Sequence, residues 1–201
     1  MYRWRRLSED ERRIELAFRK RQQRPWHSLK HRDLGAGAYL ITASCHEHSP
    51  IIGHSAERMT HFAESLLQTL DEAADETKAW VVLPNHYHVL VISKAVLEVL
   101  KALGKLHGRT SFEWNGEEGK RGRKVWFNAA ETRMKSDAHE GATLNYIHHN
   151  PVKHGYVGKW TDWPWSSARE YVNEVGREAA LEHWKAYPVD EYGAGWDDAS
   201  L

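Results

Sequence analysis

Residues 79–93, AWVVLPNHYHVLVIS, decide the fold. They form two runs rich in apolar, β-branched and aromatic side chains, separated by Pro84 and Asn85. Such runs are typical of strands, and Pro and Asn are typical of the turn between two strands. The stretch therefore predicts two adjacent strands, at residues 79–83 and 86–93, that are joined as in a hairpin.

The sequence before this hairpin predicts a strand and a helix. Residues 36–44, AGAYLITAS, have strand character, and residues 45–53 have turn character. Ser55 is expected to cap a helix that extends to about residue 76. Helical spacing predicts that this helix has a buried face made by Met59, Phe62, Leu66, Leu67 and Leu70.

The sequence after the hairpin predicts a second helix at residues 95–106 and a further strand at residues 124–128. Between them lies a Gly-rich basic loop, NGEEGKRGRK, at residues 115–124. A third helix is expected at residues 137–150. Its start is indicated by the capping-box pattern of Asp137 and Glu140, and its end is indicated by Pro151.

The order of these elements is β-α-β-β-α-β, followed by one more helix. This order is that of the split βαβ arrangement. The sequence therefore predicts an α+β fold with a ferredoxin-like core, in which a central antiparallel sheet carries the histidines of residues 86–88.

Composition indicates a folded chain with charged tails. Of the 201 residues, 41% are hydrophobic and 28% are charged, which is enough apolar material for one core. We expect one domain over 1–201, with a core at about 35–160, a basic arm at 1–34, and a Trp-rich and then acidic tail at 161–201. Cys45 is the single cysteine, so neither an internal disulfide nor a thiolate zinc site is expected.

The formal net charge of zero hides an uneven distribution. The arm has 11 Lys and Arg against 5 Asp and Glu, and residues 161–201 have 3 against 9. Such a chain can present one face that binds anions, although charge runs are also common on ordinary solvated surfaces. No run reaches the roughly 18 apolar residues that cross a bilayer, and the N-terminus lacks a signal-peptide core. We therefore expect a cytoplasmic protein without membrane contact.

Two groups of residues have chemical potential. In a strand, His86 and His88 project from the same face and Tyr87 from the other, so the two imidazoles can hold one metal ion. On a helix, Tyr146 and Asn150 are four residues apart and share a face, which suits a nucleophile beside a metal ligand. Taken alone, each group also fits an ordinary structural role.

Three motifs together resemble one family. NHYHVLV at residues 85–91, LNYIHHNPVKHGYV at 144–157 and WTDWPWSS at 160–167 are similar to motifs of the REP-associated tyrosine transposases, relatives of the single-tyrosine HUH transposases of small bacterial insertion sequences. The resemblance covers about residues 38–171. It implies a ferredoxin-like core, a bound divalent metal and a catalytic tyrosine on a C-terminal helix.

The family's functional residues can be placed on this sequence. The resemblance assigns the metal-binding pair to His86 and His88, the nucleophile to Tyr146 and the third ligand to Asn150. Insertion-sequence relatives usually have Gln at that last position, so Asn indicates the REP-associated branch. His149 remains an alternative third ligand. A second His-x-His, at His46, His48 and the residue between them, has no tyrosine motif in register and is interpreted as unrelated.

The chemistry implied is cleavage of single-stranded DNA. A phenol with a pKa near ~10 is a poor nucleophile at neutral pH, so it needs an activated electrophile or a nearby positive charge. We hypothesise that Mg²⁺ or Mn²⁺ polarises the scissile phosphate while Tyr146 attacks in line and the 3′-hydroxyl leaves. The product is a 5′-phosphotyrosine that a second 3′-hydroxyl can attack, which rejoins strands. Two nitrogen ligands favour Mn²⁺ more than an all-oxygen site would.

The partner that the resemblance implies is single-stranded DNA with foldback hairpins, the repetitive extragenic palindromes, and the sequence is compatible with both a monomer and a homodimer. The tryptophans of residues 160–165 are expected to pin the tail to the core, and the acidic tail to cover a basic cleft. Candidate DNA contacts are Lys120, Arg121, Arg123, Lys124, Lys153 and His149 in the core, and Arg3, Arg5, Arg6, Arg12 and Arg13 in the arm.

Two other function classes were weighed against this one. A non-catalytic nucleic-acid-binding module can use a ferredoxin-like sheet, but it needs exposed aromatic side chains on the central strands. A replication initiator or relaxase shares the chemistry, but typically comes with a larger helicase or has more than one tyrosine in the nucleophile motif. Neither fits this sequence as well as a transposase does.

Overall fold

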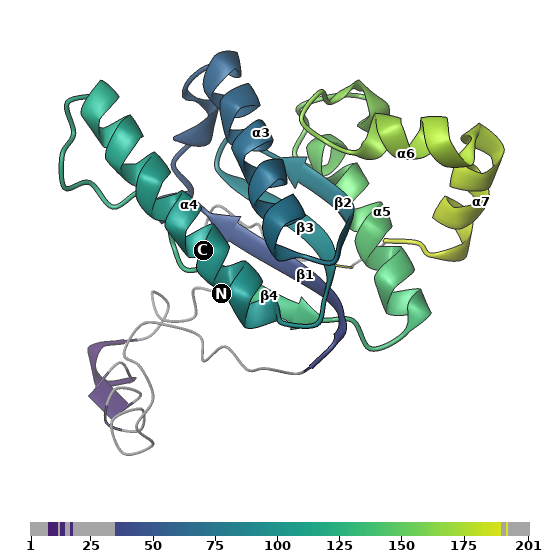
Figure 1. The fold of residues 1–201 in the computed structure, drawn as a ribbon, viewed down its shortest axis with the longest axis horizontal. Helices are drawn as coiled ribbons and strands as arrows, with labels where there is room; N and C mark the ends of the chain where they lie inside the picture. The colour runs from purple at the N-terminus through teal and green to yellow at the C-terminus, as the bar shows by residue number, and fades with distance from the viewer. Residues whose placement is uncertain (1–7, 12, 15–16, 18–34, 190–191, 193–201) are drawn as a thin grey trace.

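In a computed structural model of the chain, the described residues are 8–11, 13–14, 17, 35–189 and 192. A four-stranded antiparallel sheet lies at the centre, with the strand order β2-β3-β1-β4 (Figure 1). The strands are β1 (Gly37–Ser44), β2 (Glu76–Val82), β3 (His86–Ser93) and β4 (Ala130–Arg133). The helices are α3 (Ala56–Ala73), α4 (Val96–Glu117), α5 (Asp137–Lys153), α6 (Ala168–Val175) and α7 (Arg177–Ala186).

The connections confirm the predicted α+β fold. Helix α3 joins β1 to β2, and α4 joins β3 to β4, so each helix links two strands that are separated in the sheet by a strand of the other unit. This interleaving of two βαβ units is the split βαβ arrangement. As a result, β1 and β3 are the two central strands, and the histidine pair lies on one of them.

Helix α3 follows from its sequence almost as predicted. The Ser55 side chain accepts a hydrogen bond from the Arg58 amide at 3.1 Å and so caps the first turn. Met59, Phe62, Leu66 and Leu70 are buried, whereas Leu67 is only partly buried. The helix ends at Ala73 rather than near residue 76, because Glu76 already belongs to β2.

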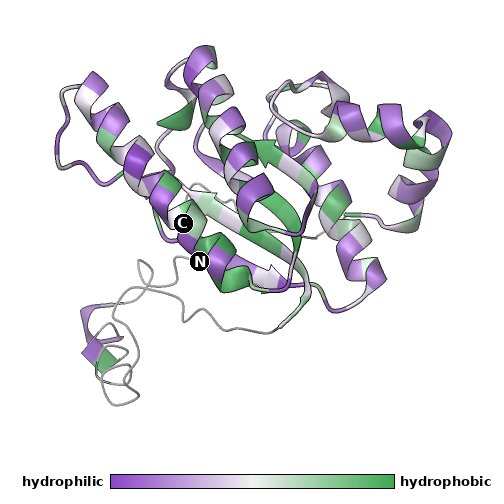
Figure 2. Cartoon of the chain, in the orientation of Figure 1, coloured by the Kyte–Doolittle hydropathy of each residue, from purple (hydrophilic) through white to green (hydrophobic). Residues whose placement is uncertain are grey.

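The two faces of the sheet are covered by different helices. On one face, Tyr87 of β3 packs against Phe62 of α3, with ring centroids 5.7 Å apart, and contacts His107 of α4. The other face contacts α5. Figure 2 shows the strands mostly in the hydrophobic colour, with hydrophilic bands on the outer sides of the helices. The core therefore lies on the sheet, and α5 is placed against the face that carries His86 and His88.

Two predicted boundaries are wrong after β3. Helix α4 continues past residue 106 to Glu117, because its buried face extends through His107, Thr110 and Trp114. The fourth strand is at Ala130–Arg133 rather than at 124–128. The earlier segment makes only an isolated bridge, between Cys45 and Trp126. The Trp126 indole is turned into the core, where it donates to Thr110 Oγ1 at 3.0 Å.

Helix α5 also differs from its prediction at both ends. Its cap is Ser136, whose side chain accepts from the His139 amide at 3.2 Å, rather than Asp137. It runs through Pro151 and ends at Lys153. A proline removes one helical N–H and is costly in a helix interior, but near the last turn little helix remains to be disrupted. Lys153 therefore stays on the helix, seven residues after Tyr146 and on the same face.

The tryptophan segment after α5 is pinned to the core, as predicted. Trp163 is buried and its indole donates to the Val82 carbonyl at 2.9 Å. The Trp165 carbonyl accepts from the Val82 amide at 2.9 Å, and Ser166 makes a bridge to Val81. The segment thus lies along the edge strand β2. Within the described part of the chain, no helix is long and apolar enough to cross a membrane.

Stability is expected to fall between about pH 6.5 and pH 4 because of buried histidines. Burial lowers the pKa of His107 from 6.5 to about 4. Between these values the unfolded chain binds a proton that the native chain does not, so acid favours unfolding, by up to about 3 kcal/mol for this residue. Urea unfolding at pH 7 and pH 4.5 measures the change. His107→Gln is expected to reduce it, and an unchanged pH dependence in this variant would contradict the assignment.

Candidate active site

Strand β3 presents His86 and His88 from one face, as the alternation predicts. Both are buried, at 2% and 0% exposure, and their ring centroids are 5.0 Å apart. Tyr87 points to the opposite side of the sheet, where its hydroxyl lies 3.0 Å from His107 Nε2. The two imidazoles therefore face α5.

Helix α5 places Tyr146 and Asn150 against this histidine pair. The Tyr146 hydroxyl lies 3.4 Å from His88 Nε2, and Asn150 Oδ1 lies 3.3 Å from His86 Nε2. Tyr146 is 2% exposed and Asn150 is fully buried. Two motifs that are about sixty residues apart in the sequence thus form one cluster, in which Tyr146 faces His88 and Asn150 faces His86.

His149, the alternative to Asn150, faces elsewhere. Its ring lies 5.1 Å from the ring of Trp184 on α7. Its pKa is lowered, first by burial and then by the nearby Lys153. Of the two candidates for a third ligand, the structure brings Asn150 to the histidine pair and directs His149 towards α7.

Lys153 and His154 complete the surroundings of the site. The Lys153 ammonium lies 5.0 Å from the centre of the Tyr146 ring, so a positive charge stands beside the phenol. The His154 ring lies 5.2 Å from the His86 ring. His148, in contrast, is structural: its Nε2 is 2.9 Å from Ser167 Oγ, and burial, with His183 nearby, lowers its pKa to about 3.

Two polar residues of the site were missed by the sequence analysis. Asn85 Oδ1 lies 2.7 Å from His86 Nδ1, and Thr42 Oγ1 lies 2.7 Å from His88 Nδ1. Thr42 is paired with His88 in the register of β1 and β3. Asn85 is the first residue of the NHYHVLV motif, which offered a signal, whereas Thr42 is identified only by the strand register.

The groups that could bind a metal ion in this cluster are the imidazoles of His86 and His88 and the carboxamide of Asn150. Among the residues that the structure describes, no three His, Cys, Asp or Glu side chains converge as a metal centre. The third oxygen or nitrogen donor near the histidine pair is the Asn150 amide, and its Nδ2 is buried without a hydrogen-bond partner. Two nitrogen ligands and an amide oxygen suit Mn²⁺ and are compatible with Mg²⁺.

The C-terminal region packs against α5 beside the tyrosine. Asn145 Nδ2 donates to the Tyr187 carbonyl at 2.8 Å, and Tyr187 lies against Gly141, where a Cβ would come within 2.6 Å of its ring. The Tyr192 ring lies 5.5 Å from the Tyr146 ring, and its hydroxyl bonds Thr143. The described part of the predicted tail therefore covers the tyrosine side of α5 through rings and backbone contacts rather than through its acidic residues.

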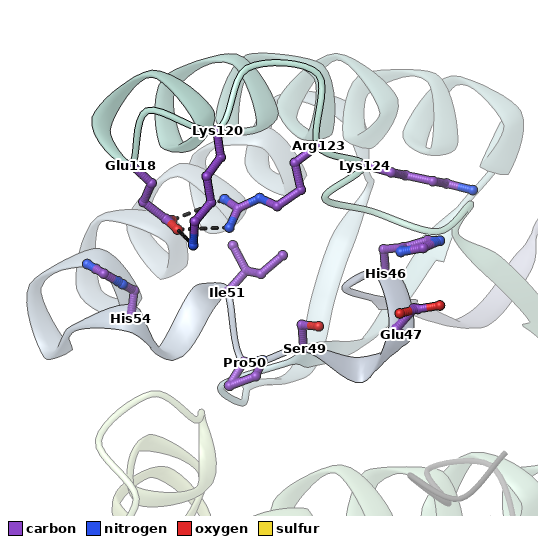
Figure 3. A pocket seen from close by; sticks show the side chains of 10 residues that line it. All are labelled: His46, Glu47, Ser49, Pro50, Ile51, His54, Glu118, Lys120, Arg123 and Lys124. Carbon is purple, nitrogen blue, oxygen red and sulfur yellow. Dashed lines mark hydrogen bonds and ion pairs between the residues drawn. The ribbon is translucent and has the colours of Figure 1, made fainter.

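The predicted basic loop borders a pocket of about 470 Å³ (Figure 3). Its other wall is the loop that contains His46 and Ser49. Lys120 and Arg123 both bond the Glu118 carboxylate, and the pKa of that carboxyl is strongly lowered, chiefly by Arg123. These two cations are therefore partly neutralised, as the dashed lines in Figure 3 show.

The remaining two cations of the loop differ from each other. Arg121 is held away from the pocket, since it donates to the Phe112 carbonyl at 2.7 Å and stacks on the Phe112 ring at 4.2 Å. Lys124 lines the pocket, lies 4.9 Å from the Phe127 ring, and has no carboxylate partner within the described residues. The sequence predicted both Lys124 and Arg121 as DNA contacts, but of these two only Lys124 lines the pocket in the structure.

The second His-x-His does not join the first. Its loop has two residues in the left-handed region, Glu47 at φ 59° and His48 at φ 51°, and the His46 ring packs on Phe127 at 4.8 Å. In the arm, Arg3, Arg5, Arg6 and Arg12 lie outside the described residues. Arg13 lies 3.9 Å from Asp10 on an exposed surface.

The fold and site define an α+β protein with a histidine pair on a central strand, opposite a tyrosine on a following helix. Comparison with known proteins confirms the family resemblance. A Haemophilus influenzae protein that carries the provisional name of REP-associated tyrosine transposase is 28% identical over 166 residues, which span 76% of this chain and 89% of that protein. The REP-associated tyrosine transposase of Escherichia coli is 29% identical over 128 residues, or 60% and 68% of the two chains.

A solved structure confirms the fold. It is that of a REP-associated tyrosine transposase bound to a REP hairpin, and it covers 81% of this chain and 89% of its own, with 20% identity and a TM-score of 0.56. No family model matches the sequence.

Proposed function

We propose that the protein is a metal-dependent endonuclease and strand transferase that cleaves single-stranded DNA beside foldback hairpins and forms a 5′-phosphotyrosine intermediate. The observation that carries this proposal is the buried cluster in which the Tyr146 hydroxyl lies 3.4 Å from His88 and Asn150 lies 3.3 Å from His86. The similarity to proteins named as transposases supports it.

The residues of the cluster divide the chemistry between them. His86, His88 and Asn150 would hold Mg²⁺ or Mn²⁺, which when bound draws charge from the non-bridging oxygens of the scissile phosphate. Tyr146 loses its phenol proton to solvent and attacks the phosphorus, so that a bond forms to the phenol oxygen while the bond to the 3′-oxygen breaks. The 3′-oxygen takes up a proton and leaves as a hydroxyl. Lys153 places a positive charge beside the phenol and stabilises its anionic form.

One copy of the chain brings the tyrosine and the histidines together, since α5 packs on its own sheet. We infer that a monomer can hold a complete site. The hairpin DNA bound in the solved structure supports a hairpin substrate for this chain. Two basic side chains, Lys153 beside Tyr146 and Lys124 in the pocket of the basic loop, are suited to contact DNA phosphates.

A non-catalytic binding module fits less well. Strands β1 and β3 are almost wholly buried, and the aromatic side chains on them, Tyr39 and Tyr87, are 0% exposed. Stacking platforms for single-stranded nucleic acid need exposed rings on such strands. The central strands therefore support a catalytic cluster better than an open platform.

The test is a search for the covalent intermediate. Single-stranded hairpin DNA from the flanks of the protein's own gene is labelled at the 5′ or the 3′ end and incubated with the protein and Mn²⁺ or EDTA. On a denaturing protein gel, 3′-label is expected to migrate with the protein only when metal is present. Binding without an adduct, across metals and flanking sequences, would overturn the proposal in favour of the binding module.

Lys124 is expected to contribute to DNA affinity and Arg121 is not. Lys124 lines the pocket without a carboxylate partner among the described residues, whereas Arg121 is held on Phe112. Removal of one phosphate contact lowers the slope of log affinity against log salt by about 1. Fluorescence anisotropy with labelled hairpin DNA, between about 50 and 200 mM salt, compares Lys124→Ala with Arg121→Ala. Equal effects of the two variants would contradict this distinction.

A further inference from the structure

Both histidines of the pair have a polar partner on Nδ1, which is the ring nitrogen that points away from α5. For His86 the partner is Asn85 Oδ1 at 2.7 Å, and for His88 it is Thr42 Oγ1 at 2.7 Å. On the other side of each ring, His86 Nε2 faces Asn150 Oδ1, and His88 Nε2 faces the Tyr146 hydroxyl. The two rings are thus held in the same orientation by two different residues.

The orientation of the Asn85 amide is fixed from its other end. Asn85 Nδ2 donates to the His48 carbonyl at 3.2 Å, so Oδ1 is the atom that faces His86. The Asn85 carbonyl accepts from the Cys45 amide at 2.7 Å. The His48 carbonyl is presented by a loop in which Glu47 and His48 both adopt left-handed conformations, an arrangement that is costly for residues other than glycine.

The Asn85 contact determines the tautomer of His86. An amide oxygen can only accept a hydrogen bond, so His86 Nδ1 must carry the ring proton. In the neutral ring, Nε2 then has a lone pair, and this lone pair faces the Asn150 carboxamide at 3.3 Å. A divalent cation between the ring and the carboxamide would be bound by this lone pair and by the amide oxygen.

The Thr42 contact can act in the same way on His88. Thr42 and His88 are opposite each other in the antiparallel pairing of β1 and β3, which fixes the distance between them. The threonine hydroxyl can accept from Nδ1–H, and His88 Nε2 is then the atom with the lone pair. Hydrogen bonds of this kind to the outer nitrogen orient metal-binding histidines and make them stronger ligands.

We propose that Asn85 and Thr42 are positioning residues that hold His86 and His88 as Nδ1–H tautomers, so that both Nε2 atoms are offered to one divalent cation. This inference rests on the proposed function, because it assigns the cation to the histidine pair. It adds that the strained loop at residues 46–48 serves the active site by orienting Asn85 rather than by supplying ligands of its own.

The test uses the full chain without metal and then with Mn²⁺. Two-bond ¹H–¹⁵N correlation spectra report the protonated nitrogen of each histidine ring. In the wild type, His86 and His88 are expected to be protonated on Nδ1. In Asn85→Ala, His86 is expected to gain the Nε2–H form, which a free imidazole side chain favours, while His88 stays unchanged. In Thr42→Val, His88 is expected to gain the Nε2–H form while His86 stays unchanged.

Metal affinity gives the second readout. Mn²⁺ affinity, measured by the electron paramagnetic resonance signal of free Mn²⁺, is expected to fall about 10- to 100-fold in Asn85→Ala. Asn85→Asp restores an acceptor to His86 Nδ1 and is expected to recover the affinity. Thermal unfolding midpoints serve as the control for folding.

The outcomes separate the two proposals. If the wild type binds no Mn²⁺, the proposed function fails, whatever the tautomers are. If the wild type binds Mn²⁺ but His86 is protonated on Nε2 in the metal-free protein, the positioning role is overturned. It is also overturned if Asn85→Ala shifts the tautomer without any loss of Mn²⁺ affinity. If Asn85→Ala does not fold, the wild-type tautomers and the Asn85→Asp affinity still decide the question.

Discussion

Tyr146→Phe is expected to abolish covalent attachment to DNA and strand cleavage, while hairpin DNA is still bound with nearly wild-type affinity. The variant removes the one oxygen that would attack the phosphorus. Loss of a nucleophile in enzymes that form a covalent intermediate lowers the rate by about 10⁴-fold or more. We therefore expect neither adduct nor cleaved strand in assays that detect the wild-type reaction easily.

The change is expected to leave the fold intact. A phenylalanine ring keeps the packing of Tyr146 against His88 and Tyr192, whose centroids lie 5.2 and 5.5 Å from its own. The hydroxyl contact at 3.4 Å from His88 is lost, and a single hydrogen bond contributes about 1 kcal/mol. Circular dichroism and a thermal unfolding midpoint close to that of the wild type would show that the loss of activity is chemical.

Tyr156→Phe is the matched control. Tyr156 follows the same helix, lies 5.3 Å from the Trp163 ring, and is 43% exposed. Its hydroxyl is not directed at the histidine pair in any contact that the structure describes, so the variant is expected to cleave and to form the adduct normally. An adduct that persists in Tyr146→Phe, or that disappears in Tyr156→Phe, would refute the assignment of the nucleophile.

The sequence was sufficient to predict the fold because its strands and first helix are marked by local patterns. The run at residues 86–93 is almost wholly apolar outside its histidines, and the α3 face repeats Met59, Phe62, Leu66 and Leu70 at helical spacing. The boundaries that failed lack such patterns. The β4 sequence, AETR, has two charged residues. An edge strand tolerates charged residues, because only one of its two edges is hydrogen-bonded to a neighbouring strand. The β4 segment becomes a strand through its pairing with β1.

The second half of α4 was missed for a related reason. Up to residue 106 its buried positions are aliphatic, but they continue as His107, Thr110 and Trp114, which are ambiguous in a hydrophobic pattern. Burial of these side chains depends on partners elsewhere, such as the Trp126 indole that bonds Thr110. Tertiary packing, rather than local preference, therefore sets the length of this helix.

The candidate site was predictable in its pairs but not in its supporting contacts. His86 with His88, and Tyr146 with Asn150, follow from the periods of a strand and a helix. That the two pairs meet follows only from the packing of α5 on the face of β3 that carries the histidines. Thr42 is 46 residues away from His88 in the sequence, and only the strand register places it beside the ring. The same holds for Tyr192, which covers Tyr146 from the end of the described chain.

Asn150→Ala is expected to lower metal-dependent cleavage by at least about 100-fold and to weaken Mn²⁺ binding. Even partners that only orient a metal ligand reduce affinity or activity by about 10- to 100-fold when they are mutated, so the loss of a ligand should reach at least the upper end of that range. Asn150 is fully buried and its Oδ1 lies 3.3 Å from His86 Nε2. Cleavage is measured with labelled hairpin DNA over a range of Mn²⁺ concentrations, and excess Mn²⁺ is expected to restore part of the rate.

His149→Ala is the matched control, because it changes the adjacent residue on the same helix. Its ring is directed to Trp184 on α7, so the variant is expected to lose some packing energy and to keep the wild-type dependence on Mn²⁺. Asn150→Asp, which replaces the amide oxygen by a carboxylate oxygen, is expected to bind Mn²⁺ at least as tightly as the wild type. If His149→Ala lost Mn²⁺ affinity and Asn150→Ala kept it, the third ligand would be His149, and α5 would have to rotate from the position described here.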